Sequence, residues 1–245
     1  MVPAKHWFVF LAMSQACVPN DTQRPDAGSK AATPPQKRPK GTALRSLDPM
    51  IATPFREEFS RRNLGPLWRA SSSWEIDKGA LCAKGARNRG AWLARRLPRN
   101  ARIEFDAVSY SPEGDIKAEL WGDGHSGATS VSYTNATSYL VIFGGWKNHF
   151  HVLARLNEHA ANRLEIRVDP GSSNFRFRPV VPERKYHFKV ERTDGKTLRW
   201  FVDGVEMLTL EDAAPLVGLG HDHMGFNEWQ VRVCFDNLSI TPLKE

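Results

Sequence analysis

The chain has 245 residues, of which 41% are hydrophobic, and its eight Trp and thirteen Phe can supply the core of one sizeable domain. Its formal net charge is +7, but residues 18–48 carry +3 of this and Lys5 carries one more, so about +3 remains on the rest of the chain. An excess of basic residues this small gives no reason to expect a nucleic-acid partner.

Residues 1–17 (MVPAKHWFVFLAMSQAC) are typical of a secretory signal peptide, because a basic start and a short apolar run precede small residues. The segment resembles a bacterial lipoprotein signal, which implies that Cys17 is the lipidated first residue of the mature chain. Ser14 stands where that pattern prefers Leu, and ordinary signal-peptidase cleavage after Ala16 fits equally well. Both alternatives predict export, and the first predicts a membrane-anchored lipoprotein of the bacterial cell envelope.

Residues 18–48 are predicted to form a disordered, Pro-rich tether. They contain many polar residues and almost no large apolar ones, so burial cannot offset the entropy lost on ordering the backbone. The domain that follows is expected to span residues 49–245.

Short runs of β-forming residues, separated by turn signals, follow one another through residues 49–245. No convincing amphipathic helix and no internal repeat interrupt them. The pattern predicts an all-β, two-sheet antiparallel β-sandwich. The expected strands are 55–59, 73–76, 80–83, 92–97, 102–109, 116–121, 131–134, 164–168, 186–192, 198–202, 205–210 and 231–240, together with a hairpin within 138–156.

The hairpin within 138–156 (SYLVIFGGWKNHFHVLARL) is predicted to lie at the centre of the sandwich. Residues 139–143 are strand formers, and Gly144 and Gly145 allow a second backbone, a ligand or the ring of Trp146 to approach closely. Lys147-Asn148 makes a plausible turn. Alternation then gives the second strand one apolar face, and an opposite face that carries His149, His151 and Arg155.

Three stretches carry a family resemblance: GALCAKG, YHFKVERTDGKTLRWFVDGVEM and the ending HMGFNEWQVRVCFDNLSITPL. With them, residues 52–243 resemble the concanavalin A-like lectin/glucanase superfamily, and most closely the bacterial jelly-roll domains described as 3-keto-disaccharide hydrolase-like. The resemblance implies a jelly-roll sandwich. It says little about chemistry, because the superfamily contains enzymes, lectins and structural domains.

The alternation of side chains predicts a carbohydrate-binding surface. Ile116, Ala118 and Leu120 are expected to face the core, which leaves the side chains between them on the opposite face. An exposed indole among charged groups suits a sugar, since the ring stacks on C–H groups while the charges bind hydroxyls. If the strands are neighbours, the predicted ligand-binding residues are Glu104, Asp106, Glu119, Trp121, His151 and Arg155. A solvated charged sheet with one supporting aromatic residue is the alternative.

A catalytic site is less well supported. Glucanases of the superfamily carry Glu-x-Asp-x-x-Glu on one strand, but here Glu104-Phe105-Asp106 is followed by Ser109 in the last position. Glu119 remains as a second carboxylate on another strand. The sequence therefore favours a binding module over an enzyme, with no cofactor.

Metal binding is weakly indicated. His221-Asp222-His223 has too few ligands for zinc, and solvent-exposed loop histidines are the simpler interpretation. Asp236 occupies a position where some relatives hold structural calcium, but a single carboxylate does not make a calcium site.

Cys82 and Cys234 are the only cysteines besides Cys17, and an exported location would allow them to pair. Parity places both on outward faces. The resemblance implies that the early and final strands share a sheet, so that a cross-strand bridge becomes possible. Two free thiols are the alternative.

Taken together, the sequence predicts an exported and lipid-anchored module that binds carbohydrate or associates with the envelope. A glycan-processing hydrolase and a purely structural envelope protein remain as alternatives. The expected partners are a carbohydrate and, through the lipid on Cys17, a membrane.

Overall fold

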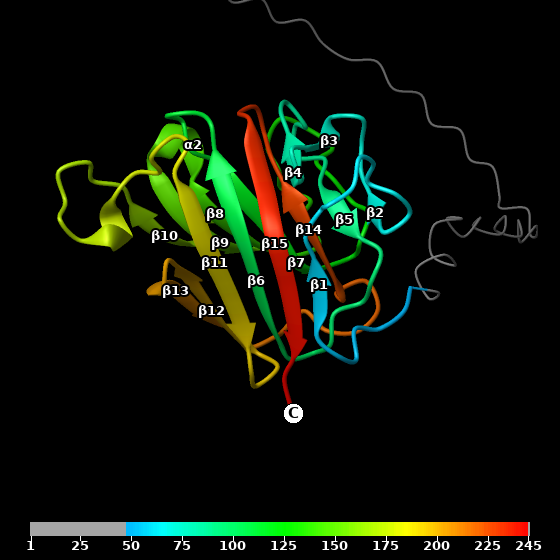
Figure 1. Ribbon diagram of the computed structural model, residues 1–245. Helices are drawn as coiled ribbons and strands as arrows, with labels where there is room; N and C mark the ends of the chain where they lie inside the picture. The colour runs from blue at the N-terminus through cyan, green and yellow to red at the C-terminus, as the bar shows by residue number, and fades with distance from the viewer. Residues whose placement is uncertain (1–47, 245) are drawn as a thin grey trace, which may run out of the picture. The chain divides into compact units, whose positions relative to one another are not determined.

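A computed structural model describes residues 48–244 of the protein. The predicted signal peptide, its lipidation at Cys17 and nearly all of the predicted tether lie outside the described residues. The described part is a jelly-roll β-sandwich of two antiparallel sheets, as the sequence predicts (Figure 1). No helix among residues 48–244 is long and apolar enough to cross a membrane.

The first sheet has eight strands, in the order β13-β12-β11-β6-β15-β4-β3, and β1 pairs with the far half of β15. Its longest strands, β6 and β15, lie side by side at its centre (Figure 1). The strands are β1 (Phe55–Glu57), β3 (Trp74–Asp77), β4 (Ala80–Ala83), β6 (Ala101–Ser109), β11 (Lys185–Arg192), β12 (Thr197–Val202), β13 (Val205–Glu211) and β15 (Val233–Pro242).

The second sheet has seven strands, in the order β10-β9-β8-β7-β14-β5-β2. The predicted hairpin forms its β8–β9 pair, in which Tyr139 lies opposite Arg155. The strands are β2 (Trp68–Arg69), β5 (Ala91–Leu93), β7 (Ile116–Gly122), β8 (Tyr139–Gly144), β9 (Phe150–Arg155), β10 (Leu164–Arg167) and β14 (His223–Asn227). A short left-handed turn, α2 (Gly145–Asn148), joins β8 to β9, and the 3-10 helix η1 (Phe175–Phe177) follows β10.

Aromatic side chains fill the space between the sheets. Phe226 of the second sheet stacks on Phe235 of the first with ring centroids 4.2 Å apart, and Phe105 meets the edge of Phe226 at 5.0 Å. Phe188 stacks on Phe105 at 4.9 Å, so the rings form one continuous cluster. On β6 and β11 these rings alternate with more exposed residues, which is the pattern that predicted a sandwich.

Several strands differ from the sequence prediction, and β2 (Trp68–Arg69) is not among the expected strands. Residues 131–134 do not form a strand. They belong to the long connection between β7 and β8. The stretch His223–Asn227, predicted to be a loop at its start, is the fully buried strand β14. A strand buried on both faces lacks the polar alternation from which strands were recognised.

The cysteines Cys82 and Cys234 form a disulfide between β4 and β15, where they are direct cross-strand partners with Cα atoms 4.0 Å apart. Their neighbours Leu81 and Phe235 belong to the core, so the bridge lies on the other face, as parity predicts. It is nevertheless buried, with Cys82 fully inaccessible.

Candidate functional site

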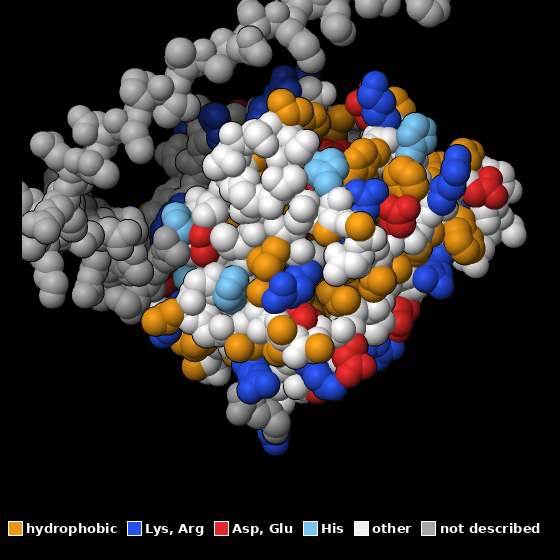
Figure 2. Space-filling model, turned by 180° about the vertical axis from the view of Figure 1, so that it is seen from behind, with side chains coloured by type: hydrophobic (Ala, Val, Ile, Leu, Met, Phe, Trp, Pro, Cys, Tyr) orange, Lys and Arg blue, Asp and Glu red, His pale blue; other side chains and the backbone are white. Residues whose placement is uncertain are grey.

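The outer face of the seven-stranded sheet is the face turned away from the other sheet. Leu140, Ile142 and Val152 point outward there, where Tyr133 and Ala136 of the β7–β8 connection cover them and form a second hydrophobic cluster. Figure 2 looks onto this side of the molecule, where hydrophobic side chains lie among basic, acidic and histidine side chains. The connection therefore converts a sheet face into a covered surface that can hold a cavity.

Trp121 was predicted to be the exposed aromatic residue of a sugar-binding surface. That prediction is wrong, because its side chain faces the core. The ladder between β7 and β14 shifts register, since Leu120 pairs with Met224 and Gly122 with His223, and Trp121 between them has a φ of 54°. A bulge of this kind reverses the side-chain direction that strict alternation predicts. Trp121 is 1% exposed and belongs to the core between the sheets.

Trp121 is also held by polar contacts inside the core. Its indole Nε1 donates to the Pro98 carbonyl at 3.1 Å, and the guanidinium of the buried Arg192 lies 3.9 Å from the ring centroid. These contacts identify Trp121 as a structural residue.

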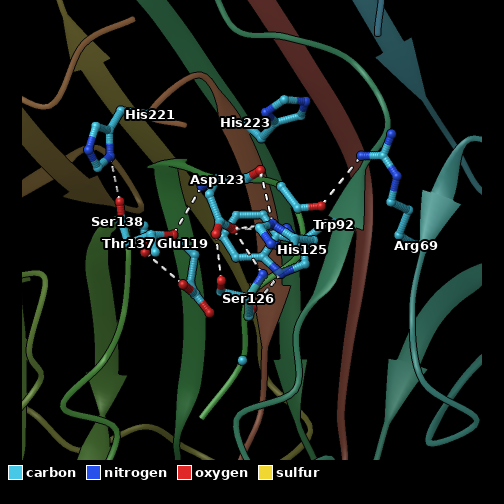
Figure 3. A network of polar contacts seen from close by, with 12 residues as sticks. Arg69, Trp92, Glu119, Asp123, His125, Ser126, Thr137, Ser138, His221 and His223 are labelled. Atoms are coloured by element: carbon cyan, nitrogen blue, oxygen red, sulfur yellow. Dashed lines mark hydrogen bonds and ion pairs between the residues drawn. The ribbon is translucent and has the colours of Figure 1, made fainter. Parts of the chain in front are cut away.

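Glu119 does face outward, but it is fully buried beneath the β7–β8 connection. Its carboxylate accepts hydrogen bonds from Ser138 Oγ at 2.6 Å, from Tyr133 Oη at 2.9 Å and from Asn227 Nδ2 (Figure 3). Burial raises the pKa of Glu119 to about 7, against the opposing effect of these donors and of Lys117. The Glu119 carboxylate therefore links the β7–β8 connection to the sheet and is inaccessible to solvent.

His151 and Arg155 are not part of an outward surface either. His151 is buried on the core side, with its ring stacked 4.3 Å from Phe143, and burial lowers its pKa to about 4. Arg155 donates through Nε to Asp212 at 2.7 Å. Alternation gave the parity of this strand correctly, but assigned the core face and the outer face the wrong way round.

Glu104 and Asp106 lie on the outer face of the other sheet, so the six predicted ligand-binding residues do not share one surface. Asp106 accepts from Asn237 Nδ2 at 2.7 Å and pairs with His187 Nδ1 at 2.9 Å. These contacts hold the pKa of Asp106 below its usual value, although burial opposes them. Glu104 lies 3.6 Å from His187 Nε2.

A cavity of about 420 Å³ opens at one end of the outer face of the seven-stranded sheet. Trp146 and Trp229, both half-buried, contribute indoles to its lining. We call it the indole pocket. Its other lining residues are Asn88, Glu113, Asp115, Lys117, Val131, Ser132, Ile142, Lys147, Glu158, His159, Gln230 and Val231.

Lys117 is the centre of a buried polar network in the indole pocket. Its Nζ donates to Glu158 Oε2 at 2.8 Å and to Asn88 Oδ1 at 2.7 Å, and all three residues are buried. Asp115 lies beside them, and its pKa is raised by burial and by the nearby charges of Glu158 and Glu113. The pocket therefore presents donors and acceptors in fixed positions.

Both indoles stand where a strand runs into a loop. Trp146 follows the glycines that end β8, and a Cβ on Gly144 would lie 2.5 Å from Val180 Cγ2, so the chain can turn here only with glycine. The guanidinium of Arg163 lies 4.4 Å from the Trp146 ring centroid, and that of Arg87 lies 4.8 Å from the Trp229 ring. Sequence reasoning missed Trp229, because β14, the strand that it follows, was not among the predicted strands.

The predicted exposure of the loop histidines is wrong for one of them. His223 is 1% exposed and lies between Asp48 Oδ2 at 2.9 Å and Asp222 Oδ1 at 2.8 Å. His221 is half-buried and contacts the Thr137 carbonyl. Within residues 48–244 no three His, Cys, Asp or Glu side chains are placed to hold a metal ion.

Neither a family model nor a curated protein matches the chain. Solved structures match its fold. Carbohydrate-binding module CBM66 from Bacillus subtilis is 14% identical with a TM-score of 0.51, over 74% of this chain and 98% of that one. A putative glycosyl hydrolase from Parabacteroides distasonis is 13% identical with a TM-score of 0.50, over 77% of this chain and 94% of that one.

The carbohydrate recognition domain of Emp47p is also similar, at 12% identity and a TM-score of 0.50, over 78% of this chain and 95% of that one. At these identities the likeness establishes the fold alone.

Proposed function

We propose that this protein is an exported, lipid-anchored carbohydrate-binding module of the bacterial cell envelope, and that the indole pocket binds the glycan. The observation that carries the proposal is the pairing of Trp146 and Trp229 with the buried Lys117 network in one cavity. The volume of about 420 Å³ lies in the range typical of small-ligand sites.

The chemistry of the indole pocket matches that of a sugar. A pyranose has apolar C–H faces, which stack on indoles, and a rim of hydroxyls, which need both donors and acceptors. Lys117 supplies a cation, Asn88 an amide, and Glu158 a carboxylate. Because these groups already bond one another, little ordering is needed when a ligand enters.

The solved structures with this fold support the same class of ligand. The names of the three similar structures refer to a carbohydrate-binding module, a glycosyl hydrolase and a carbohydrate recognition domain.

Two observations support export, and the first of them also supports a lipid anchor. Residues 1–17 have the pattern of a signal peptide that ends at Cys17, and the disulfide between Cys82 and Cys234 suits an oxidising compartment. Replacement of Cys17 by Ser should release the protein from membranes into the soluble fraction. A wild-type protein that is already soluble, with an unmodified N-terminus at Cys17, contradicts the lipid anchor.

A glycan array probed with the purified domain, residues 49–245, tests the site. Trp146→Ala and Trp229→Ala should each weaken binding about tenfold or more, because a stacking surface is lost. Phe177→Ala is the matched control, since Phe177 is an exposed aromatic residue outside the pocket and its loss should change nothing. A domain that is folded but binds no glycan contradicts the proposal and favours a structural envelope protein.

Glycan hydrolysis in the same pocket is the second candidate function. Burial and neighbouring charge raise the pKa of Asp115, while Glu158 forms an ion pair with Lys117. Glycoside hydrolysis uses two carboxyl groups near the scissile bond, and a raised pKa suits the one that acts as the general acid. Asp115→Asn should abolish the release of reducing ends but keep glycan binding, and a wild-type protein that releases none excludes this candidate.

A further inference from the structure

A second cavity, of about 430 Å³, lies on the same side of the molecule as the indole pocket. Its lining includes Arg69, Arg89 and His125 together with Trp92, and we call it the arginine pocket. Figure 3 shows Arg69, Trp92 and His125. Trp92 donates through Nε1 to the Ser126 carbonyl at 2.8 Å, which holds the β7–β8 connection beside the ring.

The two pockets share one boundary. Asn88 lines the indole pocket and Arg89, the next residue, lines the arginine pocket. The amide of Ala128 donates to the Asn88 carbonyl at 2.9 Å, so residues 88–89 and 127–128 are joined where the two cavities adjoin. A Cβ on Gly127 would lie 3.0 Å from the Asn88 carbonyl oxygen, so a larger residue here would crowd the backbone between the two cavities. A ligand longer than one sugar can therefore extend from one pocket into the other.

The arginine pocket is basic, and no carboxylate is part of its lining. Two of its basic side chains have acidic partners outside it, since Asp48 binds Arg69 at 2.6 Å and Asp123 binds His125 at 2.9 Å. Arg89 is exposed and pairs with no carboxylate among residues 48–244.

A hydroxyl in the arginine pocket also lacks a partner. Ser71 Oγ is buried and makes no hydrogen bond to any described atom. A buried hydroxyl without a partner loses free energy that a ligand acceptor can restore. Arg89 thus offers a guanidinium suited to a carboxylate or a sulfate, and Ser71 adds an unpartnered hydroxyl to the residues that line the pocket.

We propose that the arginine pocket is the anion-binding subsite of one extended glycan site. It binds the carboxylate or sulfate group of the sugar that follows the one stacked in the indole pocket. The preferred ligand is accordingly an acidic glycan. This inference rests on the proposed glycan-binding function.

Matched pairs of immobilised glycans test the subsite. Each pair contains an acidic polysaccharide and its neutral counterpart: a polyuronate with its carboxyl-reduced form, and a sulfated galactan with its desulfated form. The wild-type protein should bind the acidic member at least tenfold more tightly, and added salt should reduce the difference. The first pair reports on carboxylate and the second on sulfate.

Arg89→Gln should remove most of this preference while leaving the affinity for the neutral member unchanged. Arg56→Gln is the control, because Arg56 is an exposed arginine on β1 of the other sheet and its loss should keep the preference. Circular dichroism verifies that both variants are folded.

The outcomes separate the two proposals. If the wild-type protein binds both members of every pair equally, or if Arg89→Gln keeps the full preference, the anion subsite is wrong while the indole pocket stands. If no glycan binds, or if Trp146→Ala and Trp229→Ala bind as the wild type does, the indole-pocket proposal itself fails.

Discussion

The two sheets have outer faces that follow the same alternation but differ in what covers them. On the eight-stranded sheet, Glu104, Asp106 and His187 form a row of side chains at the surface. On the seven-stranded sheet, Lys117 and Glu119 are at most 3% exposed. Charged residues with similar spacing therefore form a solvated surface in one case and a buried polar network in the other.

The difference comes from the β7–β8 connection. The alternating pattern of a strand shows which side chains share a face. It does not show whether another segment of the chain covers that face. Tyr133 reaches back over β7 and donates to Glu119, so the connection is part of the second layer of the molecule. The pocket exists because that covering is incomplete around Trp146.

Trp121→Ala should have the largest effect, because Trp121 is a buried core residue. The variant therefore distinguishes a core tryptophan from the tryptophans of the indole pocket. Removal of this buried indole should lower the free energy of unfolding by about 3–5 kcal/mol. The indole also contacts Arg192, whose guanidinium would lose its ring partner. Denaturant unfolding measures the loss, and Trp146→Ala is the matched control, with an expected loss of less than half as much. Equal losses for the two variants would show that Trp146 contributes as much to the stability of the fold as Trp121 does, which would contradict the distinction between a core and a pocket residue.

Reduction of the Cys82–Cys234 bridge should have the next largest effect. It joins residues 152 positions apart, and removal of such a bridge costs about 2–5 kcal/mol. Cys82→Ala/Cys234→Ala and wild-type protein in reducing agent should lose similar stability, and the agent should not destabilise the double variant further. Two titratable thiols in the denatured, unreduced Cys17→Ser protein would contradict the bridge.

The fold was predictable because most strands show their burial in their sequence. Ile103, Phe105 and Ala107 alternate with charged residues on β6, and the cysteine pair lies where parity placed it. The site was less predictable, since one residue with positive φ at Trp121 reverses the direction that alternation gives. Sequence alone also could not show that residues 131–134 form a cover instead of a strand.

The pocket residues were missed for a related reason. Lys117 was correctly placed on the face opposite Ile116, but its partner Glu158 comes from a loop 41 positions later. Contacts between a strand and a distant loop leave no periodic trace in a sequence. The tryptophans that follow β8 and β14 are local features, and they are the part of the site that sequence could have supplied.

Glu119 should make stability depend on pH. Its pKa in the folded protein is raised from 4.5 to about 7, so its favourable contribution is complete below about pH 4.5 and is lost as pH rises through 7. The loss should reach about 3 kcal/mol above pH 7, at about 1.4 kcal/mol for each pKa unit.

Glu119→Gln isolates this effect, because burial also raises the pKa of Glu228 to about 7 and that contribution stays in both proteins. Unfolding measured from pH 4 to 9 should show a smaller fall in stability for the variant than for the wild type. Parallel curves would show that Glu119 keeps the same charge throughout, and the account of the covered face would then be wrong.

Glu104→Gln and Asp106→Asn should have the smallest effects, and they test the uncovered face. Their partner His187 is 51% exposed in its side chain, so solvent screens the contacts and each should be worth less than about 1 kcal/mol. Asp106→Asn keeps a carbonyl oxygen that Asn237 Nδ2 can still bond. Both variants should bind glycans as the wild type does, because these side chains lie on the opposite side of the sandwich from both pockets. A loss of glycan binding in either variant would move the site to the eight-stranded sheet and remove the functional distinction between the two faces.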